Sequence, residues 1–274
     1  MMNNHRQRGL RGNLWKASLL PYLLFILIPL VALLAGIRPA DLARTLQQPS
    51  VWQAVRLSLL TSAASVIVTL IIGTPVAYYL SHRQYRSFRL VDTLVDLPTV
   101  LPPAVAGVAL LLAFGRRGLL GGWFNLLGIS LPFTTAAVVM AQTFVAAPLF
   151  IKSAALGFSA IDCELKKSAA LDGANRWQTF RHIIVPMSWP SMLTGAMLTW
   201  ARALGEFGAT IIFAGNYPGR TQTMPSAIYV GFELDLNVAV TLSVILVAFS
   251  FIALITVKWF VYRYIEPFAQ ETFD

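Results

Sequence analysis

Apolar residues along this chain are gathered in six long runs, and the shorter segments between the runs carry most of the polar and charged residues. A helix needs about 20 consecutive, mostly apolar residues to cross the hydrocarbon core of a bilayer. Each run is long enough, so the pattern predicts six transmembrane helices. They cover residues 17–37, 57–80, 94–114, 133–156, 187–213 and 238–261.

Prolines interrupt two of these runs. Pro98, Pro102 and Pro103 fall near the start of the third run, and Pro148 falls inside the fourth. Within a membrane, a backbone carbonyl without its helical partner is tolerated only where protein or water satisfies it. We therefore predict that the third run begins as broken or re-entrant backbone facing protein or an aqueous path.

Composition supports a membrane protein. The 274 residues are 57% hydrophobic and 12% charged, with a mean hydropathy of +0.66. Soluble globular domains carry about twice that charged fraction. The net charge of +9 fits basic cytoplasmic loops better than nucleic-acid binding, because no soluble fold presents the basic residues. The single cysteine, Cys163, excludes an intrachain disulfide. The predicted fold class is an all-α polytopic membrane protein.

The basic residues also predict an orientation. With the N-terminus inside, fourteen of the 21 Lys and Arg residues fall on the cytoplasmic side, six fall outside, and Arg202 lies within the fifth run. Membrane proteins keep an excess of Lys and Arg in their cytoplasmic loops. We expect cytoplasmic tails at residues 1–16 and 263–274, and a cytoplasmic position for residues 152–186.

Residues 152–186 are patterned like a folded element rather than a simple connection. Residues 164–171 are mostly good helix formers, and Asp172-Gly173 follows them as a turn signal. Asn175 is a suitable cap for a second helix. A short helix, a turn and a second capped helix are therefore predicted here.

The second of these helices carries an amphipathic stripe. Arg176, Trp177, Phe180 and Ile184 recur at helical spacing, and Pro186 closes the segment. A stripe that mixes aromatic and basic residues suits docking of a cytosolic partner. It suits equally an amphipathic helix lying in the lipid headgroups, with Trp177 and Phe180 dipped into the bilayer. The pattern alone leaves both interpretations open.

The same residues resemble the cytoplasmic loop of ATP-binding-cassette (ABC) importer permeases. The match runs over Lys167-Ser168-Ala169-Ala170-Leu171-Asp172-Gly173 and continues at Ile183 and Pro186, with the family's spacing from glycine to proline. Lys167 and Ser168 replace the Glu and Ala that the family has at these positions. The resemblance implies that an ATPase docks here, on a surface that includes Lys167, Ser168, Ala169, Asp172, Gly173, Trp177, Ile183 and Pro186.

Four further stretches resemble the molybdate and tungstate permeases of this family. They are residues 96–107, 114–118, 201–211 and 215–223. The resemblance covers roughly residues 50–261, which implies an ABC type I importer permease domain over 51–262 and an additional helix at 17–37. Sulfate permeases share the Gly-Glu-aromatic-Gly pattern and the proline-rich third run, and they are the alternative.

The resemblance implies a mechanism with several partners. Two copies of the chain form the pathway in the inner membrane. A dimer of cytosolic ABC ATPases docks on them, and a periplasmic or lipid-anchored binding protein delivers the oxyanion. This chain contains no Gly-x-x-x-x-Gly-Lys-Ser/Thr phosphate loop. We therefore expect no cofactor in this chain, with ATP and magnesium bound by the ATPase.

Arg202 and Glu206 are charged residues placed midway along the fifth run. They are four positions apart, so on a helix they share a face and can form an ion pair. The pair either fixes helix packing or belongs to a pathway or gate, together with the backbone break at Pro102 and Pro103. Gly205 and Gly208 are expected to allow close helix approach.

Other polar residues are weaker candidates. Thr99, Thr210 and Asn216 could donate hydrogen bonds to a passing anion or could simply bond within the protein. Arg116, Arg117 and Arg220 lie on the predicted outer side, and either they contact acidic residues of the binding protein or they are solvated loop charges. Residues 266–274 are too short for a regulatory domain.

Two other classes of protein compete with an importer permease. An ion-driven secondary transporter would show internal repeats and several intramembrane carboxylates, and Glu206 is the one clear intramembrane acid. A membrane-embedded enzyme would bring chemistry-bearing residues together. The histidines, His5, His82 and His182, lie outside the six runs and far apart, so they suggest no metal or nucleophile site.

Overall fold

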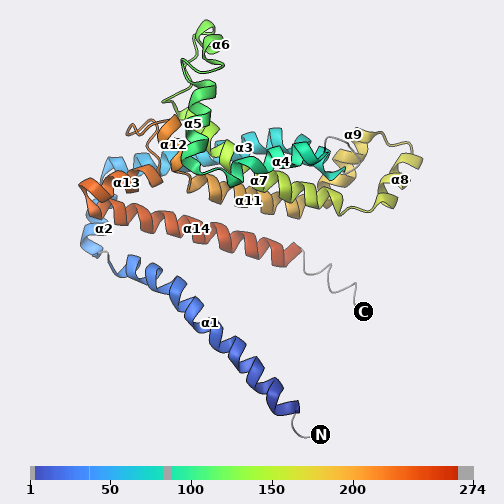
Figure 1. The fold of residues 1–274 in the computed structure, drawn as a ribbon, viewed down its shortest axis with the longest axis horizontal. Coiled ribbons are helices and arrows are strands. Elements are labelled where there is room, and N and C mark those ends of the chain that lie inside the picture. Colours follow the sequence, from blue (N-terminus) through green and yellow to red (C-terminus); the bar gives the residue numbers. More distant parts are fainter. Residues whose placement is uncertain (1–3, 37, 83–87, 265–274) are drawn as a thin grey trace.

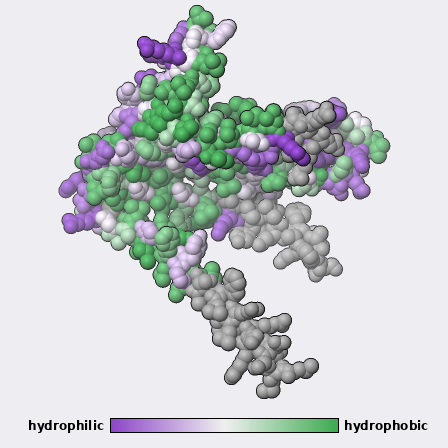
Figure 2. Space-filling model, viewed as in Figure 1, coloured by the Kyte–Doolittle hydropathy of each residue, from purple (hydrophilic) through white to green (hydrophobic). Residues whose placement is uncertain are grey.

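The structure is a computed structural model that describes residues 4–36, 38–82 and 88–264. Within these residues the regular elements are helices, as predicted. Several helices run side by side along one body (Figure 1), namely α3 (Pro49–Ser81), α4 (Phe88–Val100), α7 (Thr135–Ser159), α11 (Trp189–Leu204) and α14 (Leu236–Tyr264). Two others, α5 (Pro103–Phe114) and α6 (Gly121–Leu126), project from this body. Hydrophobic residues cover much of the surface between the two ends of this body (Figure 2).

Three of the six predicted spans are continuous helices. They are α3 (Pro49–Ser81), α7 (Thr135–Ser159) and α14 (Leu236–Tyr264), and each contains a stretch long and apolar enough to cross a membrane. They correspond to the second, fourth and sixth predicted spans. Pro148 lies inside α7 without ending it.

The third predicted span is broken, as its prolines predict. α4 (Phe88–Val100) and α5 (Pro103–Phe114) meet at an angle of 115°. Pro103 starts α5, where its missing N–H costs nothing because the first N–H groups of a helix have no intrahelical acceptor. Pro102 precedes it in an extended conformation (φ −54°, ψ 135°), which separates the two helices.

The fifth predicted span is not one continuous helix. α11 (Trp189–Leu204) ends before Gly205, and α12 (Gly208–Phe213) begins after Phe207. The prediction of an uninterrupted helix over 187–213 was therefore wrong. The break falls at Gly205-Glu206-Phe207, where a carboxylate takes over a capping role described below.

The first predicted span belongs to a second bent pair. The Leu19–Ala35 part of α1 (Asn4–Ala35) meets α2 (Pro39–Leu46) at 73°, and these two segments together are long and apolar enough for a broken span or a re-entrant loop. α1 extends away from the helical body (Figure 1), and the large apolar side chains from Leu19 to Leu34 that are described are mostly exposed.

α7 is the central helix of the body. It packs against α3, α4, α5, α11 and α12. Glycines permit the closest approaches: a Cβ at Gly73 of α3 would meet Phe150 at 3.1 Å, and a Cβ at Gly157 of α7 would meet Ser191 at 2.6 Å. At the opposite edge, α13 (Met224–Leu234) packs on α14.

Candidate functional site

The segment expected to bind a cytosolic partner is a folded helical unit at one end of the body (Figure 1). We call residues 160–187 the coupling segment. It contains α8 (Cys163–Leu171), α9 (Arg176–Thr179), a π-helical turn η1 (Phe180–Ile184) and α10 (Val185–Met187). Residues 152–159 of the predicted segment continue α7 instead.

The turn after α8 has the geometry that its sequence predicts. Gly173 adopts a φ of +85°, which a residue with a Cβ rarely takes. The N–H of Ala174 donates to the carbonyl of Ala169 at 2.9 Å, and the N–H of Gly173 donates to that of Ala170 at 3.2 Å. These two bonds form a Schellman motif, which satisfies carbonyls at the end of the helix.

The start of α9 is also confirmed. The Asn175 side chain accepts from the N–H of Gln178 at 2.9 Å, and the Gln178 side chain accepts from the N–H of Asn175 at 2.8 Å. This reciprocal capping box satisfies two N–H groups that have no partner in the helix. α8 is capped in a similar way, since Asp162 accepts from the N–H of Glu164.

Pro186 acts on the backbone differently from the prediction that it simply closes the segment. It lies within α10, directly after the π turn. Proline has no N–H, and its ring crowds the carbonyl four residues earlier, here that of His182. The helix is wider at this point, because the N–H of Val185 donates to the carbonyl of Phe180, five residues earlier. The following helix, α11, begins at Trp189.

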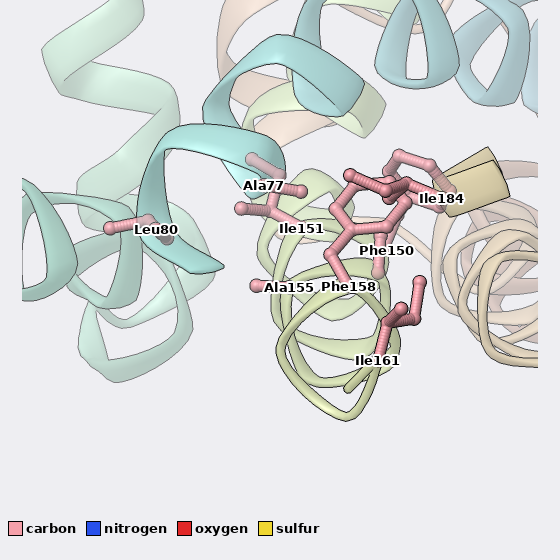
Figure 3. Close-up of a cluster of buried hydrophobic side chains, with 9 residues drawn as sticks. Ala77, Leu80, Phe150, Ile151, Ala155, Phe158, Ile161 and Ile184 are labelled. Atoms are coloured by element: carbon pink, nitrogen blue, oxygen red, sulfur yellow. The ribbon is translucent and has the colours of Figure 1, made fainter. Parts of the chain in front are cut away.

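Buried side chains fasten the coupling segment to α3 and α7. Ile184 belongs to one hydrophobic cluster with Ala77 and Leu80 of α3 and with Ile151 and Phe158 of α7 (Figure 3). The cluster also contains Phe150, Ala154, Ala155 and Ile161. Movement of the coupling segment is therefore expected to carry the ends of α3 and α7 with it.

Three rings, which we call the aromatic anchor, extend this attachment. Phe180 stands edge-on to Tyr78 of α3, with ring centroids 4.8 Å apart, and to Phe158 of α7 at 6.0 Å. The sequence stripe was expected to expose Phe180 together with Trp177, but Phe180 is half-buried. Tyr78 and Phe158 were missed by the sequence reasoning, although both are aromatic residues near the ends of predicted spans.

The opposite surface of the coupling segment is open. Leu171 is 88% exposed and Trp177 is 64% exposed, and both are large apolar side chains. Lys167, Ser168 and Asp172 are exposed as well. Of the remaining predicted docking residues, Ala169 is buried, Ile183 is half-buried, and Pro186 and Gly173 are exposed.

The predicted pair of Arg202 and Glu206 is formed. Arg202 Nη1 lies 2.7 Å from Glu206 Oε2, and the Glu206 side chain is 1% exposed whereas that of Arg202 is 37% exposed. The pair bridges the end of α11 rather than lying along one helix. The other carboxylate oxygen, Oε1, accepts from the N–H of Ala209 at 2.9 Å, so Glu206 also caps α12.

α12 packs closely on the first turns of α5. A Cβ at Gly208 would lie 2.7 Å from the Cβ of Pro103, and one at Gly107 would lie 2.9 Å from the carbonyl oxygen of Ala209. The expectation of close approach is therefore confirmed for Gly208. It was wrong for Gly205, which is exposed and whose nearest neighbour is the Ala201 carbonyl at 3.8 Å. Gly205 instead ends α11.

The weaker polar candidates separate into two kinds. Thr99 donates to the carbonyl of Asp96 at 2.6 Å, which is a bond within its own helix. Thr210 Oγ1 and Asn216 Oδ1 are buried, and neither has a hydrogen-bond partner among the described residues. Thr210 lies on α12, close in sequence to Glu206.

Two of the three arginines predicted to lie on the outer side share a cavity of about 470 Å³. Arg116 and Arg220 line it with Phe133 and Tyr217, whereas Arg117 does not. Arg116 Nε donates to Ser130 Oγ at 3.2 Å, and Thr135 Oγ1 donates to the carbonyl of Arg220 at 2.9 Å. Phe133 has a φ of +63°, a strained value for a residue with a side chain.

Three charged residues near the α4–α7 contact were missed by the sequence reasoning. Lys152 of α7 forms ion pairs with Asp92 and with Asp96 of α4, the latter at 2.8 Å. Asp96 lies inside the third predicted span, so treating Glu206 as the one intramembrane acid was wrong. The spacing of Asp92 and Asp96, four positions apart around the start of the third apolar run, was the available signal.

The structure combines long apolar helices, helix breaks at Pro102-Pro103 and at Glu206, and the coupling segment at one end. These features define a polytopic helical membrane protein. Residues 71–270 match the family described as "Binding-protein-dependent transport system inner membrane component". The chain belongs to this family. It is therefore a membrane component of a transport system, as the sequence resemblance predicts.

The similarity to individual proteins agrees with this assignment. The chain is 42% identical to the "Putative molybdenum transport system permease protein YvgM" of Bacillus subtilis strain 168. The match covers 74% of this chain and 91% of that protein. It is 35% identical to the "Molybdate/tungstate transport system permease protein WtpB" of Thermococcus kodakarensis, and this match covers 81% of this chain and 83% of that protein.

A solved structure shows the fold. The chain matches a protein of "a bacterial ABC transporter involved in the import of the acidic polysaccharide alginate" with a TM-score of 0.73 at 15% identity, over 96% of this chain and 100% of the other. The predicted ABC importer permease fold is confirmed.

Proposed function

We propose that this chain is the permease of an ATP-driven importer of molybdate or tungstate. One observation carries the proposal: relatives from several organisms, 35–42% identical over most of the chain, are named as molybdenum or molybdate/tungstate permeases. The chemistry of the proposed outer surface is compatible with an anion, because two cationic side chains, those of Arg116 and Arg220, are among the residues that line its cavity.

The proposed assembly contains two copies of this chain, two ATPase subunits and one binding protein. The ATPase binds ATP and magnesium and docks on the exposed face of the coupling segment. The binding protein docks at the other end, where its acidic residues meet Arg116, Arg117 and Arg220. Both termini and the coupling segment lie in the cytoplasm. Residues 51–262 form the permease unit, and 17–37 form an additional helix.

The coupling segment is suited to transmit movement. Its exposed face carries Leu171 and Trp177, and its inner face is fixed to α3 and α7 by Ile184 and the aromatic anchor. Closure of the ATPase dimer pulls on the exposed face. The packed inner face passes that displacement to the membrane helices, because close-packed side chains transmit strain.

In this proposal, the transport pathway runs beside the two helix breaks. Pro102, Pro103, Arg202 and Glu206 lie on or beside the two breaks, which pack together where Gly208 meets Pro103. Irregular backbone at membrane depth is tolerated where it lines a cavity. Arg202 is partly exposed and already neutralised by Glu206, so it offers an anion a weak, transient contact, which transport requires.

The proposal is tested by uptake of labelled molybdate and sulfate in cells that carry the complete transporter. We expect molybdate uptake that excess tungstate competes away and that sulfate leaves unchanged. Sulfate uptake for which molybdate does not compete would contradict the molybdate assignment and favour a sulfate permease.

A further inference from the structure

The ion pairs of Lys152 with Asp92 and Asp96 have no role in the proposed function as described so far. All three side chains are partly exposed, at 34% for Lys152, 35% for Asp92 and 46% for Asp96. They join two helices that are far apart in the sequence, α4 and α7. Charges within membrane helices are costly, so they usually face protein or water and serve function.

Lys152 is connected directly to the coupling segment. It lies on the last part of α7, two helical turns before that helix ends at Ser159. Its neighbours Ile151 and Ala154 belong to the same buried cluster as Ile184 of the coupling segment. A displacement of the coupling segment therefore reaches Lys152 through packed side chains of one rigid helix.

Asp92 and Asp96 are connected to the pathway in the same way. They lie on α4, which ends at Val100 and turns by 115° into α5 at Pro102 and Pro103. The first turns of α5 contact α12 through Gly107 and Gly208. α12 begins at the carboxylate that binds Arg202. The three-residue network thus lies between the helix attached to the coupling segment and the helix attached to the pathway.

We propose that Lys152, Asp92 and Asp96 form a latch that makes α4 follow α7 during transport. The inference rests on the proposed importer function. The latch residues are positioning residues: they pass the displacement of the coupling segment to the α4–α5 bend and from there to Arg202 and Glu206. An ion-paired contact holds a fixed register between two helices, which an apolar contact specifies less well.

The net charge of the three-residue network favours a latch over a binding site for the transported oxyanion. One ammonium faces two carboxylates, so the network carries an excess negative charge. An anion approaching Lys152 is repelled by the carboxylates, and Lys152 already donates to both of them. Arg202, which pairs with a single carboxylate, is the better anion contact.

The latch is tested in the complete complex, reconstituted in vesicles with its ATPase and binding protein. The measured quantity is the number of ATP molecules hydrolysed per oxyanion imported. Lys152→Met is expected to raise this ratio about fivefold or more, because α7 then moves without α4. Lys152→Arg, which keeps the cation, is expected to stay near the wild-type ratio. Arg89→Met is the matched control, because Arg89 is an exposed basic residue that lies about one turn before Asp92 on α4.

A charge swap separates a latch from an anion contact. Lys152→Asp combined with Asp96→Lys places the cation on α4 and keeps one ion pair between the two helices, at positions 96 and 152, while Asp92 now shares its helix with the cation. We expect this double variant to recover at least half of the coupling lost by either single variant. An unchanged ratio in Lys152→Met overturns the latch, and so does failure of the swap to recover any coupling.

A further readout needs no transported cargo, so it separates failure of the latch from failure of the proposed function. Val105 on α5 is exposed and accepts a fluorophore after Val105→Cys in a Cys163→Ser background. Binding of a non-hydrolysable ATP analogue to the complex is expected to change the fluorescence with Lys152 present and to leave it unchanged in Lys152→Met. An equal response in both overturns the latch even if the wild type imports no molybdate.

Discussion

Gly173 is the residue on which the shape of the coupling segment depends most directly. Its φ of +85° lets the chain reverse between α8 and α9, and a Cβ there would meet no atom within 4 Å. Space is therefore not the constraint. The constraint is the left-handed backbone, which costs an ordinary residue about 1–2 kcal/mol and which asparagine tolerates better than alanine.

Substitution of Gly173 gives a graded prediction. Gly173→Ala is expected to weaken association with the ATPase by about 5–30-fold, which corresponds to the 1–2 kcal/mol of strain. Gly173→Asn is expected to weaken it less. Affinity is measured with purified permease in detergent and the isolated ATPase. Equal affinities for the two variants would show that the left-handed turn does not govern docking.

The ion pair of Arg202 and Glu206 predicts an asymmetry in stability. Glu206 is buried and Arg202 is partly exposed, so removal of Arg202 leaves a buried charge without its partner. Arg202→Ala is expected to destabilise the protein by about 3–5 kcal/mol. Glu206→Gln keeps an acceptor for the N–H of Ala209 and leaves only an accessible cation, so its cost is expected to be smaller.

Thermal unfolding of the purified variants measures this difference. The double variant Arg202→Ala with Glu206→Gln is expected to be more stable than Arg202→Ala alone, because it contains no unpaired buried charge. If Glu206→Gln were the more destabilising single change, loss of the carboxylate charge would cost more than an unpaired buried carboxylate, which would contradict the expected asymmetry.

At the scale of elements, the sequence predicted what short-range chemistry determines. The prolines at 102 and 103 mark the α4–α5 bend, Asp172-Gly173 marks the end of α8, and Asn175 marks the start of α9. Each of these signals acts within a few residues, so one sequence is enough to interpret it.

What the sequence did not predict depends on contacts between distant residues. The break of the fifth span follows from Glu206 capping α12 while pairing with Arg202, and a run of apolar residues does not reveal it. Lys152 reaches Asp92 and Asp96 across a large sequence separation. Burial of Phe180 likewise requires the rings of α3 and α7 to be in place.

The loops predicted to lie on the outer side offer a comparison between neighbouring arginines. Arg116 and Arg220 line one cavity, whereas Arg117, next to Arg116 and also exposed, does not line it. Arg220→Glu is expected to lower the affinity for the loaded binding protein by at least about tenfold, because a reversed charge repels an acidic partner. Arg117→Glu is the matched control, with a smaller expected loss. Equal losses would indicate general attraction by the loops rather than docking at the cavity.

At the scale of the whole molecule, the orientation can be tested without altering the chain. Cys163 is the single cysteine of the sequence, and it is exposed at the start of α8. A membrane-impermeant maleimide is expected to label it in inside-out vesicles and not in intact cells. Ser130→Cys in a Cys163→Ser background is expected to show the opposite pattern, because Ser130 lines the cavity with Arg116 and Arg220, which are predicted to lie on the outer side. Labelling of Cys163 from outside would reverse the orientation.

The central claim is that the coupling segment binds the ATPase while the other end of the protein does not. A photo-crosslinking residue at Leu171, which is 88% exposed, tests this directly. The control site is Leu126, which is 84% exposed. Its helix, α6, lies away from α8 and α9 of the coupling segment in Figure 1. In membranes containing the whole complex, the predicted result is a covalent product with the ATPase from position 171 and none from position 126. A product from position 126, or none from position 171, would contradict the account.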